Sequence, residues 1–175
     1  MATAGLAIAQ LANECEAEGL TLRNAERIGA ELAKLFGVKE DEVGIMRLEK
    51  QNLVFVYPPK LHNVGSIPLN TSTSVAVRTA NTKRAEVINN FAQIKHTSVF
   101  EAVDVGGKGG GEKADRHMHV IQKLMSAPVL GPAGTLGVIQ VSRKGTSAPA
   151  AGADFTPVDL QKLTSAAAAL VKCFK

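Results

Sequence analysis

Apolar positions follow a helical period in the first part of the chain. They recur every three or four residues over 2–18 and again over 21–36, which is the spacing of one face of an α-helix. Gly19 and Gly37 follow these two segments, and glycine is the commonest residue just past a helix C-terminus. The spacing therefore predicts two N-terminal helices.

The period changes to that of extended structure near residue 43. Short apolar runs, several of them rich in Val and Ile, are separated there by polar turns, as in strands joined by hairpins. Ser and Thr residues at 71–74 are suited to cap a helix that follows them. The pattern predicts, in chain order, strands at 43–48, 53–57 and 66–69, a short helix at 73–80, an extended pair at 87–88 and another short helix at 96–103.

The longest uncharged stretch of the chain lies between Lys123 and Arg143. Its length calls for comparison with a membrane span, but prolines and glycines at 128–134 divide it into two strand-length runs. The second run, 135–142, is apolar on both faces except for Gln140 and Ser142. That pattern is typical of a central strand covered on both sides. We therefore expect a β-hairpin in the middle of a sheet and no membrane-spanning segment.

A C-terminal helix is expected after the hairpin. Thr156 is suited to cap it, Pro157 fits the first helical position, and Asp159 lies three residues after the cap. Apolar residues then repeat at alternating three- and four-residue intervals to Phe174, as in a helix that packs along a seam.

The hairpin and the start of this helix resemble the closing signature of the GAF domain family. In that family an Asn-Lys pair ends the central strand, and Phe-x-x-x-Asp-Glu opens the last helix. Lys144, Phe155 and Asp159 match this pattern, whereas Arg143 and Leu160 stand in place of the Asn and the Glu. The resemblance covers roughly residues 19–175.

The resemblance implies an α/β (α+β) fold of the GAF/PAS-like type. Its central antiparallel sheet would have about six strands, with the terminal helices packed on one face and short helices and loops on the other. We expect residues 1–18 to form an N-terminal helix and residues 19–175 the GAF-like domain. The resemblance also implies a salt bridge between Lys144 and Asp159, from the end of the central strand to the last helix.

GAF domains bind small ligands between the sheet and the short helices, which directs attention to the polar residues expected there. These candidates are Ser74, Arg78, Asn89, Asn90 and Gln140. Gln140 is the sharpest, because a glutamine inside an apolar strand needs a polar partner. Each has a structural alternative. Gln140 could bond to backbone or buried water, the two asparagines could form a turn, and Arg78 could pair with Glu86 or Glu101.

No strong catalytic or metal-binding constellation is visible. His117 and His119 could place two imidazoles on one side of a strand, but only one acid, Asp115, is adjacent, and a solvated loop is favoured over a metal site. The Gly-rich segment 105–113 lacks the Gly-Lys-Ser/Thr ending of a phosphate loop. GAF-like sulfoxide reductases and bilin-binding proteins use cysteines near the pocket, whereas this chain has only Cys15 and Cys173.

Size, composition and charge limit the classes of function that are expected. A chain of 175 residues with 45% hydrophobic residues predicts one domain. The net charge of +4 is scattered without a basic block, so no nucleic-acid partner is expected. The apolar N-terminus has no Lys or Arg before Arg23, unlike a secretory signal. We expect a cytoplasmic protein.

These observations favour a non-catalytic sensory or regulatory domain that binds an unidentified small molecule, with no cofactor that the sequence can name. Signalling would pass through a partner protein or through a homodimer formed by the terminal helices, whose apolar faces need a cover. Two alternatives stay open. One is a structural dimerisation domain without a ligand. The other is a small enzyme with a site near Arg78, His96 and His117.

Overall fold

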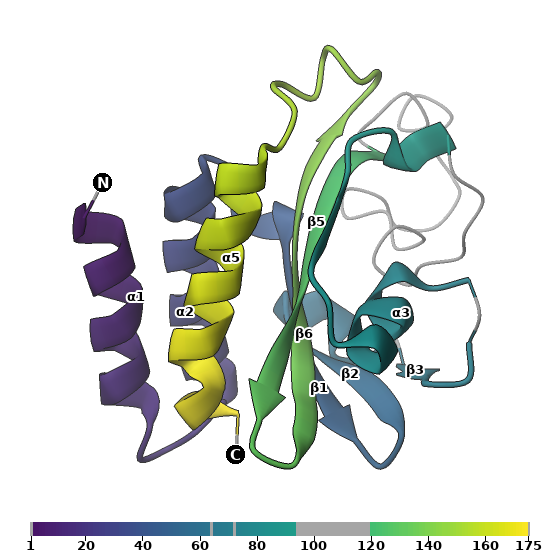
Figure 1. Cartoon of the computed structure of the whole chain (residues 1–175). Coiled ribbons are helices and arrows are strands. Elements are labelled where there is room, and N and C mark those ends of the chain that lie inside the picture. The colour runs from purple at the N-terminus through teal and green to yellow at the C-terminus, as the bar shows by residue number, and fades with distance from the viewer. Residues whose placement is uncertain (1, 64, 72, 94–119, 175) are drawn as a thin grey trace.

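An antiparallel sheet covered by helices on both faces forms the body of the molecule (Figure 1). A computed structural model describes residues 2–63, 65–71, 73–93 and 120–174. The strand order is β3-β2-β1-β6-β5-β4, and every neighbouring pair is antiparallel. The strands are β1 (Val43–Glu49), β2 (Asn52–Tyr57), β3 (Ser66–Pro68), β4 (Glu86–Ile88), β5 (Val120–Gly131) and β6 (Gly134–Gly145).

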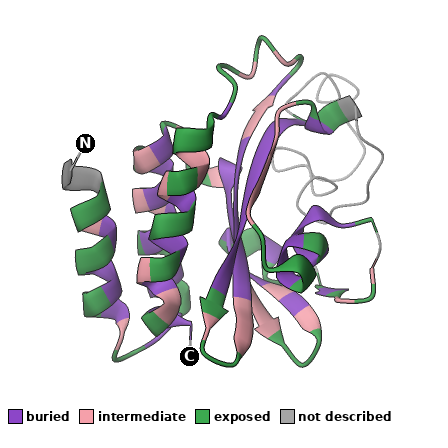
Figure 2. Cartoon of the chain, in the orientation of Figure 1, coloured by how far each residue is buried: buried purple, intermediate pink, exposed green. Residues whose placement is uncertain are grey.

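The terminal helices cover one face of this sheet. They are α1 (Ala2–Cys15), α2 (Leu22–Phe36) and α5 (Pro157–Leu170), the last continued by a short turn, η5 (Val171–Cys173). Helices α2 and α5 lie on the strands, and α1 packs outside them (Figure 1). The outward sides of the helices are exposed while the strands are buried along most of their length (Figure 2).

Local sequence signals set the ends of these helices. The Thr21 side chain accepts a hydrogen bond from Asn24 N at the start of α2, and Gly37 ends that helix with a φ of 64°. At α5, Thr156 and Asp159 form a reciprocal capping box in front of Pro157. The predicted helix starts at Thr21 and Thr156 are therefore confirmed.

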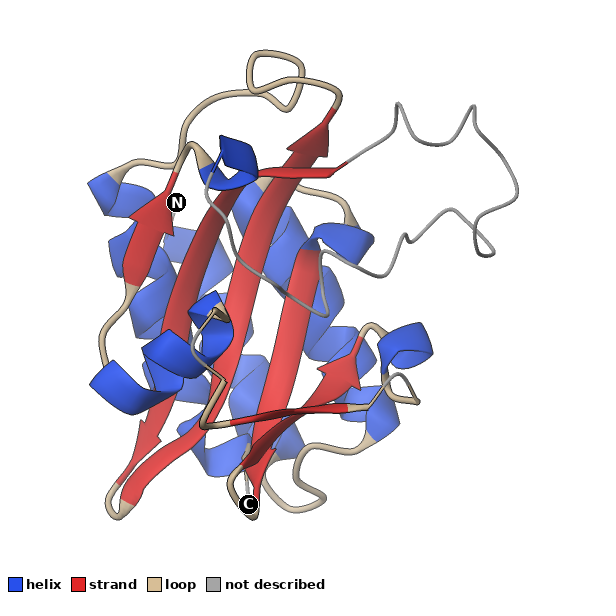
Figure 3. Ribbon diagram, turned by 90° about the vertical axis from the view of Figure 1, so that its right-hand side faces the viewer, coloured by secondary structure: helices blue, strands red, loops and turns tan. Residues whose placement is uncertain are grey.

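The opposite face of the sheet carries α3 (Val75–Thr82) (Figures 1 and 3). Two short turns, η2 (Pro59–Leu61) and η3 (Phe91–Gln93), belong to the described connections between strands. The helix predicted at 96–103 lies outside the described residues. The predicted arrangement of an α+β fold, with six antiparallel strands, terminal helices on one face and short elements on the other, is confirmed.

The central strand divides its side chains between two cores. Ile139 and Val141 belong to the apolar cluster under the terminal helices, whereas Val138 belongs to the cluster under α3. Alternate residues of a strand point to opposite faces, so Gln140 lies on the α3 side, two residues from Val138. The predicted central strand covered on both sides is confirmed.

Strand β5 begins earlier than the charge pattern suggested, at Val120. Lys123 lies within it, and only 5% of its side chain is exposed. Its ammonium lies 2.9 Å from Asp154 Oδ1, and this ion pair lets a buried lysine occupy a strand position. The hairpin therefore begins before Lys123, the residue at which the uncharged stretch starts.

The apolar face of helix α1 is buried against other helices of the same chain. Its apolar residues Ile8, Leu11, Ala12 and Cys15 are buried in the same cluster as α2 and α5. The apolar face of α1 is therefore covered by α2 and α5 of the same chain, and a homodimer through the terminal helices stays a prediction.

Candidate functional site

Three buried polar side chains connect β6, β5 and α3 on the α3 side of the sheet. Gln140 and Ser126 are directly opposite each other in the β5–β6 ladder. Gln140 Nε2 donates to Ser126 Oγ over 3.1 Å, and Ser126 Oγ lies 2.7 Å from Thr79 Oγ1. Thr79 Oγ1 donates to the backbone oxygen of Val75 over 2.9 Å. No more than 2% of any of the three residues is exposed.

The hydroxyl groups of Ser126 and Thr79 determine which atom donates in each of these hydrogen bonds. A hydroxyl has one proton to donate, and Thr79 donates its proton to Val75 O. Ser126 must then donate to Thr79 while it accepts from Gln140. The donors run from the central strand to the first turn of α3, and the surrounding apolar cluster strengthens each bond by its low polarity.

The Gln140 amide has a donor and an acceptor that its hydrogen bond to Ser126 does not use. A glutamine amide offers two N–H donors and a carbonyl acceptor. Among the described residues, only the Nε2–Ser126 bond is formed. One donor and the neighbouring carbonyl oxygen are therefore available for a polar group that is not among the described residues.

Thr79→Val is expected to lower the free energy of unfolding by about 1–2 kcal/mol, because it removes the acceptor for the buried Ser126 hydroxyl. Ser126→Ala should cost a similar amount. The loss in the double variant should be smaller than the sum of the two by about 1 kcal/mol, since both changes remove the same bond. Urea denaturation of the four proteins measures this coupling, and strictly additive losses would contradict the connected chain.

Ser74 at the start of α3 and Arg78 within α3 both have structural partners. Ser74 is buried, and its hydroxyl accepts from Val77 N over 3.2 Å as the N-cap of the helix. Arg78 is half-exposed, and its Nε donates to Glu86 Oε1 over 3.0 Å. Arg78 thus forms the pair with Glu86, whereas Glu101, its other expected partner, lies outside the described residues.

Asn89 connects the end of β4 to the residue in front of the last helix. Its Oδ1 accepts from Phe155 N over 2.9 Å, and its Nδ2 donates to Phe155 O over 3.0 Å. The side chain therefore pairs with the backbone as a strand neighbour would, 66 residues away along the sequence. Asn90, by contrast, is exposed. Of the five candidate residues, the structure joins only Gln140 to the buried polar chain.

Solved structures with the same arrangement identify the fold. The GAF domain of an Acinetobacter phosphoenolpyruvate-protein phosphotransferase superposes with a TM-score of 0.65 at 14% identity, over 97% of this chain and 92% of that one. The A. aeolicus Nlh2 GAF domain gives 0.58 at 17% identity, over 98% and 97%. This chain has a GAF domain fold. No family model and no curated protein matches its amino-acid sequence.

Enzymes share the GAF fold as well. A free methionine-R-sulfoxide reductase from Neisseria meningitidis, solved in complex with its substrate, superposes with a TM-score of 0.63 at 16% identity, over 95% of this chain and 85% of that one. Likeness at this level of identity establishes the architecture alone. Function has to be argued from the residues of this chain.

The salt bridge implied between Lys144 and Asp159 is not formed. Lys144 Nζ donates to Asp41 O over 3.1 Å, while Asp159 Oδ2 accepts from Thr156 N over 2.8 Å in the capping box. The hairpin is joined to the segment before α5 by other cations. Lys123 pairs with Asp154, and the Arg143 guanidinium lies 4.4 Å from the centre of the buried Phe155 ring. Arg143, the departure from the family signature, thus has a structural role.

The remaining chemical candidates are the histidines that the sequence analysis named. His96, His117 and His119 fall outside the described residues, so the proposed His/Arg enzyme site and the two-histidine metal site stay predictions. Within the described ranges, no group of three His, Cys, Asp or Glu residues is placed to hold a metal ion. None of the helices described is both long enough and apolar enough to cross a membrane.

Sequence reasoning missed Ser126 and Thr79. Ser126 is a single polar residue in an apolar run, as Gln140 is, and a hairpin register would have placed the two opposite each other. Thr79 gave no comparable signal, because its partner depends on how α3 crosses the sheet.

Proposed function

We propose that this GAF domain is a non-catalytic regulatory module that binds a small molecule on the α3 side of its sheet. The observation that carries the proposal is the buried Gln140 amide, which forms one hydrogen bond among the described residues. Its second N–H and its carbonyl oxygen have no partner among the described residues. A small molecule on this side of the sheet would pair with them.

The geometry of an amide limits the chemistry of the ligand. The unused N–H and the carbonyl oxygen of Gln140 belong to the same planar group, so they favour a ligand with a donor and an acceptor on neighbouring atoms. Amides and nitrogen heterocycles have such an edge. Val138 and Leu124 on this face are buried and apolar, so the surroundings of Gln140 favour a ligand that is apolar beyond its polar edge.

The positions of the cysteines support a role other than sulfoxide reduction. Cys15 and Cys173 are both buried in the cluster under the terminal helices, on the sheet face opposite to Gln140. Cys173 Sγ donates to Ala12 O, three residues before Cys15 in α1. Buried thiols in this helical layer are remote from a ligand on the α3 side. We place the protein in the cytoplasm, where it would signal through a partner or a second copy.

A domain that binds no ligand is the second candidate. The observation in its favour is that the bonds from Gln140 to Ser126 and from Ser126 to Thr79 already join α3 to the sheet. Its role would then be to hold a partner or a second copy, with the polar chain serving to fix α3 on the sheet.

A thermal-shift screen against purines, cyclic nucleotides, amino acids and common metabolites separates these candidates. A ligand at 100 times its dissociation constant adds about 2.7 kcal/mol of stability, or roughly 5–10 °C in Tm for a domain of this size. The shift should disappear in Gln140→Leu. It should persist in Gln122→Leu, which removes another buried amide whose Nε2 bonds Gly145 O. A flat screen, or a shift that survives Gln140→Leu, would contradict the proposal.

A further inference from the structure

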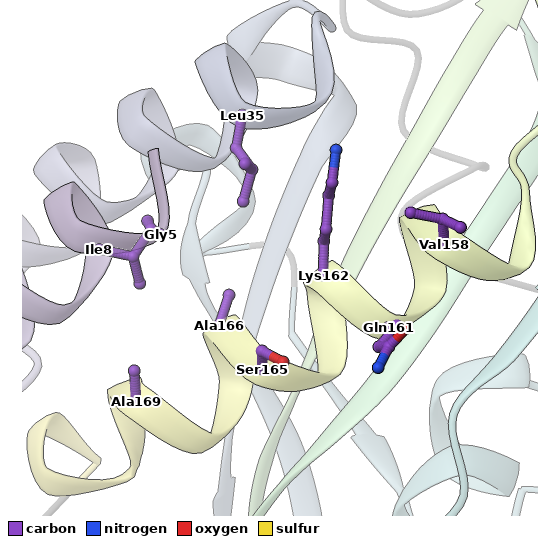
Figure 4. Close-up of a pocket in the computed structure, with 9 residues that line it drawn as sticks. All are labelled: Gly5, Ile8, Leu35, Val158, Gln161, Lys162, Ser165, Ala166 and Ala169. Carbon is purple, nitrogen blue, oxygen red and sulfur yellow. The ribbon is translucent and has the colours of Figure 1, made fainter. Parts of the chain in front are cut away.

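A hollow lies on the side of the molecule opposite to α3, between the terminal helices (Figure 4). It has a volume of about 290 Å³, near the lower limit for small-molecule pockets. Its walls come from three helices that are far apart in the sequence. They include Gly5 and Ile8 of α1, Leu35 of α2, and Lys162, Ala166 and Ala169 of α5. We call this hollow the terminal-helix groove.

The α1 wall of the groove is open because of a glycine. Gly5 lies inside α1, where glycine is a poorer helix former than alanine. A Cβ atom added at Gly5 would meet nothing within 4 Å. No close approach of a neighbouring element therefore requires glycine there, and its effect is to leave the groove unfilled.

The α5 wall carries the only charge on the described lining. Lys162 rises from the same side of α5 as Ala166 and Ala169 (Figure 4), and none of the described lining residues is acidic. Lys162 is partly buried, and it forms no ion pair with the described residues. A lysine in this position covers apolar surface with its stem and presents its ammonium group to a ligand or to water.

We propose that the terminal-helix groove binds an unbranched aliphatic carboxylate. The carboxylate would pair with the Lys162 ammonium, and the chain would lie along Ala166 and Ala169 against Ile8 and Leu35. Lys162 and Ala169 are seven residues apart on α5, or about 10 Å at 1.5 Å per residue, which suits a chain of about eight carbons. This site is separate from the α3 side and does not depend on the function proposed above.

Isothermal titration with octanoate, 1-octanol and octyltrimethylammonium tests the charge complementarity. The wild-type protein should bind octanoate more tightly than either of the other two. Lys162→Met keeps an apolar stem and removes the charge. It should weaken octanoate binding about fivefold, the upper range for a partly exposed ion pair, and leave octanol binding unchanged.

Gly5→Leu tests the groove itself. The leucine should fill the α1 side and abolish octanoate binding, while the Tm stays the same or rises because leucine is the better helix former. Loss of binding then cannot be attributed to unfolding. Gln140→Leu should leave octanoate binding unchanged. Failure of the α3-side proposal can therefore be distinguished from failure of the groove proposal.

Three results would overturn the proposal. They are absence of octanoate binding to the wild type, equal binding in Gly5→Leu, and a Lys162→Met variant that loses octanol and octanoate alike. Light scattering provides a further check. A wild-type dimer that Gly5→Leu converts to a monomer would show that a second copy of the chain, and not a carboxylate, occupies the groove.

Discussion

Gly137→Ala is expected to lower the free energy of unfolding by about 3 kcal/mol, at the upper end of the usual cost of overpacking. The added Cβ atom would lie 2.2 Å from Met46 O and 2.7 Å from a ring carbon of Phe174. The first contact is with the backbone of β1, which pairs with β6 along this stretch, so it cannot be relieved by a rotamer change. Thermal denaturation should show a fall in Tm of roughly 6–12 °C.

Gly5→Ala is the matched control for this prediction. It adds the same methyl group where nothing lies within 4 Å, and in a helix it should raise the stability by up to about 1 kcal/mol. Equal stability of Gly137→Ala and the wild type would mean that β1, β6 and the C-terminal Phe174 are not packed as described.

Asn89→Ala is expected to lower the free energy of unfolding by about 2–3 kcal/mol. The change leaves both the N–H and the C=O of Phe155 without their partner at a partly buried position. The connection between β4 and the start of α5 would loosen. Urea denaturation measures the loss, and ligand binding to the folded variant should be unchanged, because Asn89 acts on the backbone.

Asn90→Ala controls for the loss of an asparagine at the end of β4. Asn90 is exposed, so its removal should change stability by less than about 0.5 kcal/mol. If Asn89→Ala were as mild as Asn90→Ala and abolished a ligand response, Asn89 would belong to the ligand site after all.

The elements that depend on local signals could be predicted from the sequence. Thr21 and Thr156 start helices because each side chain caps the backbone three residues on. The uncharged run with Gln140 near its end predicted a central strand, because burial on both faces removes the polar alternation. The fold follows from such signals and from the resemblance at Phe155.

The candidate site could be predicted only in part, because its partners come from distant segments. Gln140 was identified as a buried amide, but Ser126 and Thr79 become its neighbours through the hairpin register and the placement of α3. Asn89 was chosen for its polarity, yet its partner is the backbone of Phe155. No local pattern encodes contacts of this kind.

The partners of charged residues were the hardest to predict, because a long side chain can reach several different partners. Lys144 was expected to reach Asp159, but Asp159 is held in its capping box and Lys144 reaches the backbone of Asp41. Lys123 was taken as the limit of the hairpin. It is instead buried within β5, because Asp154 lies close enough to pair with it.

The most direct test of the central claim is hydrogen exchange of the backbone amides with and without a ligand from the thermal-shift screen. The account predicts that a ligand bound at Gln140 slows exchange in α3 and in the facing parts of β5 and β6. Exchange in α1 and α5 should not change. Protection confined to α1 and α5, or none in α3, would contradict a regulatory site on the α3 side of the sheet.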